Sequence, residues 1–213
     1  MNKIFVFGDS VSFGELVSSN KSWPSLLSNH LDSTNKNVLV QNFSKNGDTT
    51  RLALLRLDFD ILKRSPEIVI VQFGINDCNI WLSEFGNSRV NIITFEYNLI
   101  EICKKIFSAG AKKVFLNTNH PITKESQFMD HGGEAEYKEL NTIYNESIRK
   151  AYKKLLLNHN VHLIDIELEF NSKQKIDPNF LSKSILDDGI HLSEFGQMRY
   201  LDIIIKEIKS FLG

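Results

Sequence analysis

Residues 67–74, EIVIVQFG, are the part of the chain that most constrains its fold. The run is apolar at consecutive positions and rich in β-branched residues, which is typical of a strand buried on both faces. Such strands belong to parallel sheets whose two faces are covered by helices, so this segment predicts the middle of a parallel sheet. Four further apolar runs of strand length occur at residues 3–8, 38–44, 112–119 and 161–166.

Helical patterns alternate with these runs. Apolar residues recur at helical spacing at residues 22–31, 48–64, 90–111, 136–159 and 192–212. Ser22, Asp48 and Ser193 are the predicted N-caps of three of these helices. Residues 120–136 read as a loop and residues 167–190 as irregular structure. The alternation predicts an α/β fold, a three-layer α/β/α sandwich around a mainly parallel five-stranded sheet.

Length and composition narrow the class of protein. A chain of 213 residues suits one domain, so we expect residues 1–213 to form a single domain. The net charge is −1 and the basic residues are scattered, so no nucleic-acid partner is expected. Cys78 and Cys103 are too few for a disulfide scaffold and lack zinc-ligand spacing. Without a visible signal peptide or membrane-spanning stretch, we expect a cytoplasmic protein with reduced thiols.

Polar residues gather where the predicted strands end. In open parallel sheets, ligands bind outside the carboxyl ends of the strands. Those ends carry polar segments at residues 8–10, 42–47, 74–77 and 117–120 and after Asp165. We therefore expect the chemistry of this chain at that edge of the sheet.

Ser10, in the segment FVFGDSVSFGE, is the candidate nucleophile. A serine hydroxyl is a weak nucleophile and needs a base. His191 lies three residues after Asp188 in DDGIHLSEFG, so a tight turn could let Asp188 hold one ring nitrogen and leave the other facing Ser10. That arrangement is the logic of a Ser-His-Asp triad. Asp187 is the rival for the acid, although the three-residue spacing favours Asp188.

An oxyanion also needs hydrogen-bond donors. Gly47, in NFSKNGDTT, has no side chain and precedes a predicted helix, so its backbone N–H can approach a ligand closely. Asn76, in FGIND, offers a side-chain amide. The backbone N–H of Ser10 is the third candidate donor.

These segments resemble the conserved blocks of the SGNH hydrolase family, the GDSL-type esterases and lipases. In chain order, the blocks supply Ser10, Gly47, Asn76, and the pair Asp188 and His191. The resemblance spans residues 5–197 and implies a flavodoxin-like sheet in the order 2-1-3-4-5. It also implies attack by Ser10 on an ester carbonyl, with His191 as general base and then general acid. An acyl-enzyme would form and be hydrolysed by water, with no metal or organic cofactor.

Three further residues are candidates for substrate contact. Phe13 and Trp81 lie close to the first and third blocks, where they either wall an acyl or sugar pocket or pack as ordinary aromatic residues. His120, in NTNHP, follows a predicted strand and either touches substrate or is a solvated loop histidine.

The leading hypothesis is a serine esterase that removes an acetyl or short acyl group from a carbohydrate or small molecule. An acyltransferase using the same site, and a lysophospholipase or thioesterase, remain alternatives, so the substrate partner is a small-molecule, glycan or lipid ester. A phosphate- or nucleotide-binding module is disfavoured because GDSVSFG matches neither glycine-rich phosphate-binding pattern. A non-catalytic glycan binder would leave Ser10, Asp188 and His191 without a role. The oligomeric state is not predicted.

Overall fold

A five-stranded parallel sheet forms the centre of the molecule. The computed structural model describes residues 2–34, 37–123 and 137–211. Among these residues the sheet has the order β2-β1-β3-β6-β7, with bounds Val38–Asn42, Asn2–Gly8, Ile68–Gln72, Lys113–Asn117 and Val161–Ile164. Every neighbouring pair is parallel. Counted along the chain, these are the five predicted strands in the order 2-1-3-4-5, so the predicted fold class and strand order are confirmed.

The apolar run that predicted a central strand is central. All five residues of β3 are buried, and the strand pairs with β1 on one side and β6 on the other. Phe7 of β1 and Phe73, just after β3, meet edge-to-face with ring centroids 5.2 Å apart. Both rings are fully buried. Burial of such a side chain contributes about 1.5–3 kcal/mol, so β1 and β3 anchor the core.

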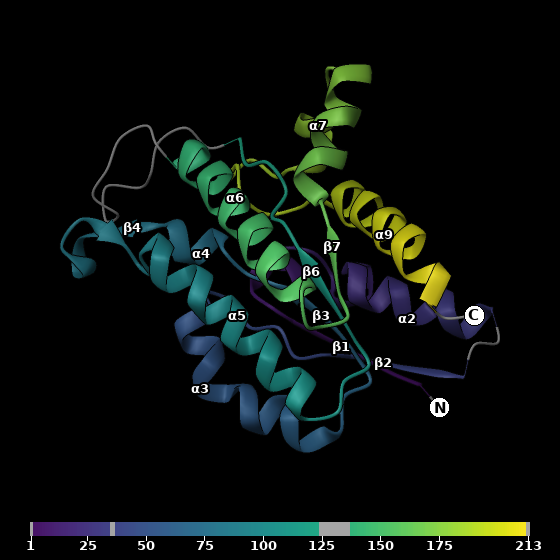
Figure 1. Cartoon of the computed structure of the whole chain (residues 1–213). Coiled ribbons are helices and arrows are strands. Elements are labelled where there is room, and N and C mark those ends of the chain that lie inside the picture. Colours follow the sequence, from purple (N-terminus) through teal and green to yellow (C-terminus); the bar gives the residue numbers. More distant parts are fainter. Residues whose placement is uncertain (1, 35–36, 124–136, 212–213) are drawn as a thin grey trace.

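The helices cover both faces of the sheet because the strand order reverses at β1. The chain steps from β1 to β2 on one side and then returns past β1 to β3 on the other. Right-handed crossovers then place the helix after β1 on the opposite face from the helices after β2, β3 and β6. Figure 1 shows α2 and α9 together, with α3, α5 and α6 across the sheet from them. Their bounds are Trp23–Ser33 (α2), Thr50–Asp60 (α3), Ile92–Ser108 (α5), Tyr137–Leu156 (α6) and Glu194–Ile208 (α9).

Residues 167–190, predicted to be irregular, contain two helices. These are α7 (Ile166–Ile176) and α8 (Phe180–Ser184). Asp165 begins α7, since its side chain accepts a hydrogen bond from the Leu168 N–H at 3.1 Å. Among the apolar residues of α7, only Ile166 and Phe170 are buried. So few apolar positions at helical spacing give too weak a pattern to predict a helix.

Short elements also lie near the carboxyl ends of the strands. They are α1 (Ser10–Phe13), α4 (Ile75–Cys78), β4 (Ile80–Trp81) and β5 (Asn87–Ser88), of which β4 and β5 form an antiparallel hairpin. The predicted loop at 120–136 falls mostly outside the described residues, which include only 120–123 of it.

One of the three predicted N-cap residues, Asp48, differs in the structure. Ser193 caps α9 as predicted, with its hydroxyl accepting the Gly196 N–H at 3.1 Å. Ser22 occupies the N-cap position of α2, but its hydroxyl donates to the Ser19 carbonyl instead. Thr49, not Asp48, caps α3. The Asp48 carboxylate instead forms an ion pair with the Arg56 guanidinium, whose Nε lies 2.5 Å from Asp48 Oδ2.

Within the described ranges, no helix combines the length and the apolar character needed to cross a bilayer. Cys78 and Cys103 are both buried free thiols. The cytoplasmic location stays a prediction.

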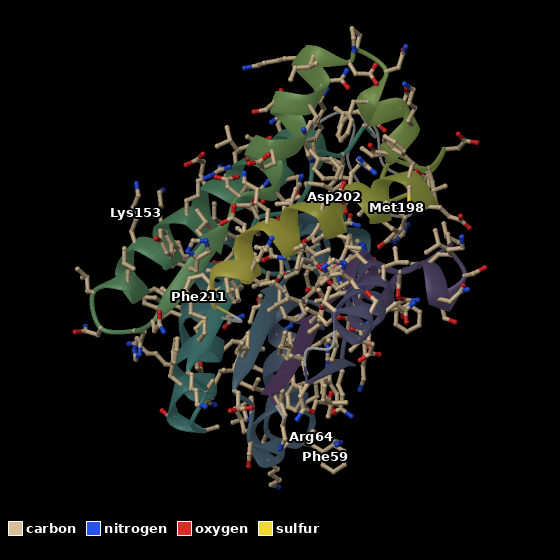
Figure 2. The ribbon with its side chains drawn as sticks, turned by 90° about the vertical axis from the view of Figure 1, so that its right-hand side faces the viewer. Phe59, Arg64, Lys153, Met198, Asp202 and Phe211 are labelled. Carbon is tan, nitrogen blue, oxygen red and sulfur yellow. The ribbon has the colours of Figure 1, made fainter. Side chains whose placement is uncertain are left out.

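We expect Gly196→Ala to destabilise the protein by about 1–3 kcal/mol through overpacking. Gly196 lies in the first turn of α9, where a Cβ would sit 2.1 Å from the Ser184 carbonyl oxygen at the end of α8. Thermal or urea unfolding would measure the change. The control is Met198→Ala on the same helix, at the nearly half-exposed position labelled in Figure 2. A Gly196→Ala protein no less stable than this control would contradict the packing argument.

Candidate active site

Ser10 lies at the turn between β1 and α1. Asp9 caps α1, with Oδ1 accepting the Val11 N–H at 3.0 Å. Gly8 allows the turn to pass close to β3, because a Cβ there would lie 2.8 Å from the Gln72 carbonyl oxygen. The turn therefore starts α1 at Ser10, directly at the carboxyl end of β1.

Asp188 and His191 form a preorganised pair in the turn before α9. One oxygen of Asp188, Oδ1, accepts the backbone N–H groups of Ile190 and His191, each at 2.9 Å. The other, Oδ2, lies 2.5 Å from His191 Nδ1. Because Asp188 uses both oxygens, the turn and the ring are held by one carboxylate. Asp187 is exposed, and the structure places Asp188, not Asp187, against the imidazole.

The same imidazole reaches Ser10. His191 Nε2 lies 2.9 Å from Ser10 Oγ, across 181 positions of sequence. With the Nδ1 proton donated to Asp188, Nε2 is free to accept the Ser10 hydroxyl proton. The structure thus brings Ser10, His191 and Asp188 into a continuous hydrogen-bonded line.

The three candidate oxyanion donors come from three adjacent strand ends. Gly47 follows β2 with φ +74°, a conformation that favours glycine. Its carbonyl accepts a hydrogen bond from Arg89 Nη1 at 3.0 Å, which fixes the plane of the following peptide. Asn76, in α4 after β3, has a buried Nδ2 with no hydrogen-bond partner among the described residues. An unpaired buried donor is costly, and it is the group that an incoming oxyanion would satisfy.

The three candidates for substrate contact lie in different settings. Phe13 is 47% exposed on α1, three residues after Ser10. Trp81 is half-buried in β4, with the Arg89 guanidinium 4.1 Å from its ring centroid. Arg89 thus joins Trp81 to the Gly47 loop. His120 is fully buried, and its Nε2 is bonded to the Ile190 carbonyl at 2.8 Å. It is neither a solvated loop residue nor open to a substrate, because the turn before α9 covers it.

No cluster of three or more histidine, cysteine or acidic side chains able to hold a metal is found in the part of the chain that the structure describes. The absence of a cofactor stays a prediction.

Comparison with known proteins assigns the chain to a family. The profile described as GDSL-like Lipase/Acylhydrolase matches residues 4–202. The chain belongs to this family. It is therefore an enzyme that hydrolyses ester bonds, and its resemblance to the SGNH hydrolases is confirmed.

Individual relatives of this acylhydrolase carry several activities in their names. An arylesterase of Vibrio mimicus is 28% identical over 210 residues, covering 99% of this chain and 90% of the relative. The thioesterase 1/protease 1/lysophospholipase L1 of Escherichia coli (strain K12) is 26% identical, covering 99% and 85%. Among solved structures, the acetylxylan esterase Axe2 of Geobacillus stearothermophilus matches with a TM-score of 0.77 at 19% identity, covering 97% and 94%. That last likeness shows the shared fold.

Burial and hydrogen bonding set the acidities around the site of this acylhydrolase. Burial alone would raise the pKa of Asp188, but hydrogen bonds from the His191 ring and two backbone N–H groups outweigh it and lower the pKa. Asp188 therefore stays ionised beside the imidazole. Burial raises the pKa of Asp9 and of Asp77 to about 7. These two fully buried carboxyls are hydrogen-bonded to backbone N–H groups, of Val11 and Thr50 respectively, and brace the turns at the site.

A buried amide network behind the site is not evident from the motifs. Ser12 Oγ donates to Gln72 Oε1 at 2.9 Å, and Gln72 Nε2 donates to Asn119 Oδ1 at 3.0 Å. Gln72 is the signal that sequence offers, because a glutamine inside the apolar run EIVIVQFG must find a buried partner. Arg89 carries no such signal, since an arginine in a polar segment is ordinary.

We expect Asp77→Asn to change how stability depends on pH. The pKa of Asp77 is raised from 3.8 to about 7 by burial, so the folded state holds a proton that the unfolded chain releases above pH 4. The free energy of unfolding then falls as pH rises from 4 to 7. The variant lacks this loss, so its stability relative to wild type should rise over that range by up to about 4 kcal/mol.

Urea unfolding at pH 4.5, 6 and 7.5 measures this difference. The control is Asp32→Asn, which removes one exposed carboxylate. A difference between Asp77→Asn and wild type that stays constant across the series would contradict an elevated pKa at Asp77.

Proposed function

We propose that this enzyme is a serine esterase that works through an acyl-enzyme on Ser10. The observation that carries the proposal is the line from Ser10 Oγ to His191 Nε2 at 2.9 Å and from His191 Nδ1 to Asp188 Oδ2 at 2.5 Å. A serine alone is a weak nucleophile, and an oriented neutral imidazole is what activates it.

The proposed steps use only these groups. Ser10 Oγ forms a bond to the ester carbonyl carbon while its proton passes to His191 Nε2. The carbonyl oxygen becomes an oxyanion that accepts hydrogen bonds from the N–H groups of Ser10 and Gly47 and from Asn76 Nδ2. The C–O bond to the alcohol then breaks, and His191 returns the proton to the leaving oxygen. Water repeats the sequence on the acyl-enzyme, which releases the acid and restores Ser10.

We infer that the substrate is an acetyl or short acyl ester of a carbohydrate or small molecule. The names of an arylesterase and an acetylxylan esterase among the similar proteins support this class. Phe13 follows Ser10 in α1, and Trp81 contacts the Arg89 guanidinium that bonds to the Gly47 carbonyl, so both rings are suited to contact a small organic group.

A lysophospholipid or acyl thioester is the second candidate. The Escherichia coli relative is named a thioesterase and lysophospholipase. Phe13 and Leu16 are also large apolar side chains exposed just after Ser10, at 47% and 64%. Such a surface would suit a longer acyl chain. The dependence of kcat/KM on acyl length separates the two candidates.

We expect wild type to hydrolyse p-nitrophenyl esters and Ser10→Ala to lose at least about 10⁴-fold in kcat, because loss of a nucleophile disables the whole triad. The panel runs from acetate to octanoate, with release of p-nitrophenol followed by absorbance. A short-acyl esterase should show kcat/KM highest at acetate or butyrate. An inert wild type, or a fully active Ser10→Ala, would refute the mechanism.

We expect Asn76→Ala to fold normally and to lose about 10²- to 10³-fold in kcat, with a smaller change in KM. The donor that it removes is used most strongly when charge develops on the substrate oxygen. Asn87→Ala removes an exposed amide from β5 and is the control. Turnover by Asn76→Ala close to that of the control would remove Asn76 from the oxyanion site.

A further inference from the structure

The turn that carries Asp188 and His191 is held mostly by hydrogen bonds within residues 186–191. The Leu186 N–H donates to the His191 carbonyl at 2.8 Å, and the Gly189 N–H donates to the Leu186 carbonyl at 2.8 Å. Together with the bonds from Asp188, these contacts fix the shape of the turn. They do not fix where the turn lies relative to Ser10.

Two hydrogen bonds, apart from the Ser10–His191 contact, tie residues 186–191 to the rest of the described chain. The Thr123 N–H donates to the Gly189 carbonyl at 2.9 Å. His120 Nε2 bonds to the Ile190 carbonyl at 2.8 Å. Both acceptors lie between Asp188 and His191 in the sequence, and the His120 contact is at the residue directly before His191. The segment after β6 therefore holds the turn.

In the hydrogen bond between His120 and Ile190, the imidazole must be the donor. A carbonyl oxygen can only accept, so His120 Nε2 carries the proton and Nδ1 of the neutral ring is bare. The ring is fully buried, and Nδ1 has no partner among the described residues. Burial lowers the pKa of His120 to about 4. The ring therefore stays neutral, with this hydrogen bond intact, around neutral pH.

His120 is itself held by α6. Asn141 Nδ2 donates to the His120 carbonyl at 3.0 Å. Asn145, one helical turn further on, accepts the Asn119 N–H at 2.7 Å and donates to the Asn119 carbonyl at 3.1 Å. Residues four apart share one face of a helix, so the two side-chain amides of α6 can hydrogen-bond to the backbone of the consecutive residues 119 and 120. Figure 1 shows α6 lying along β6 and β7 on its face of the sheet.

The same segment is also tied to the nucleophile. Asn119 Oδ1 accepts from Gln72 Nε2, and Gln72 Oε1 accepts from Ser12 Oγ in α1. All three side chains are essentially buried. The residue pair 119–120 thus touches, through hydrogen bonds, both the helix that begins at Ser10 and the turn that holds His191.

We propose that His120 is a positioning residue that sets His191 Nε2 opposite Ser10 Oγ by donating a hydrogen bond to the Ile190 carbonyl. The inference rests on the proposed function of Ser10 and His191. Without this donor the Ile190 carbonyl is left unpaired, and the turn can shift while its internal bonds persist. A displacement of about 1 Å at a catalytic group can reduce the rate by about 10²-fold.

The test compares His120→Gln with His120→Leu. A glutamine amide can reach the position of Nε2 and keep the donor, whereas leucine fills the space without one. We expect His120→Leu to lower kcat for p-nitrophenyl acetate by about 10- to 100-fold, with KM within about threefold of wild type. We expect His120→Gln to recover kcat to within about fivefold of wild type. If leucine and glutamine variants both match wild type, or both fall equally, the inference is wrong.

The matched control is Tyr200→Phe. Its hydroxyl accepts Asn117 Nδ2 at 3.0 Å, so the change removes one buried hydrogen bond from the end of β6 without touching the turn. Its kcat should stay near wild type. If His120→Leu does not fold, His120→Asn replaces it, because the shorter amide falls short of Ile190. Equal kcat values for the asparagine and glutamine variants would then overturn the inference.

A second readout does not depend on turnover. The ¹⁵N NMR shift of His191 Nε2 reports whether this nitrogen accepts the Ser10 hydroxyl, and Ser10→Ala gives its value without that contact. We expect His120→Gln to keep the wild-type shift and His120→Leu to move toward the Ser10→Ala value. If Ser10→Ala proves as active as wild type, the proposed function fails, and this shift still decides the inference. A wild-type shift in His120→Leu would count against positioning by His120.

Discussion

The pairing of β1 with both β2 and β3 is the constraint on which the site depends. Because the strand order reverses at β1, the crossover helices diverge to opposite faces of the sheet, and a ligand site is expected at the carboxyl ends of the strands there. Ser10, Gly47 and Asn76 follow those three strands in turn. Parallel register alone therefore gathers a hydroxyl, a backbone N–H and an amide at one edge. Among the strands of the described chain, the order reverses at no other place.

Amides, more than charges, fill the polar interior behind this edge. Gln72, Asn119 and Asn145 bond to one another or to backbone, so burial of each is compensated in large part. Two amide donors, Asn76 Nδ2 and Asn119 Nδ2, are buried with no partner in the described chain. In the proposed mechanism, Asn76 Nδ2 is the one of the two that meets the oxyanion, and it stays open for a charge that develops only during reaction. Such preorganised donors need no reorientation when the oxyanion forms.

The elements that could be predicted from sequence are those whose apolar pattern is long. All five strands and the five long helices follow from the spacing of their apolar residues, although α3 buries only Ala53 and Leu57 of these. Helix α7 could not be predicted, since its sequence IELEFNSKQKI has few apolar residues and the first three alternate instead of recurring at helical spacing. The choice of Asp188 over Asp187 could be favoured by spacing, yet only the path of the turn shows which carboxylate faces the ring. The position of His120 depends on hydrogen bonds from Asn141 and Asn145 of α6 to residues 119–120. No local sequence pattern predicts these contacts.

The conformation of the Asp188–His191 turn and its position relative to Ser10 are therefore determined by different contacts. Shape is local: one carboxylate binds a ring and two N–H groups within four residues, which short-range sequence can specify. Placement relative to Ser10 spans 181 positions and relies on contacts from outside the turn. A single rotation of the turn would leave the imidazole oriented by Asp188 but out of reach of Oγ. In the proposed mechanism, contacts that determine placement would set the rate of proton transfer from Ser10 without altering the ionisation of Asp188, and the His120–Ile190 hydrogen bond is one of these contacts.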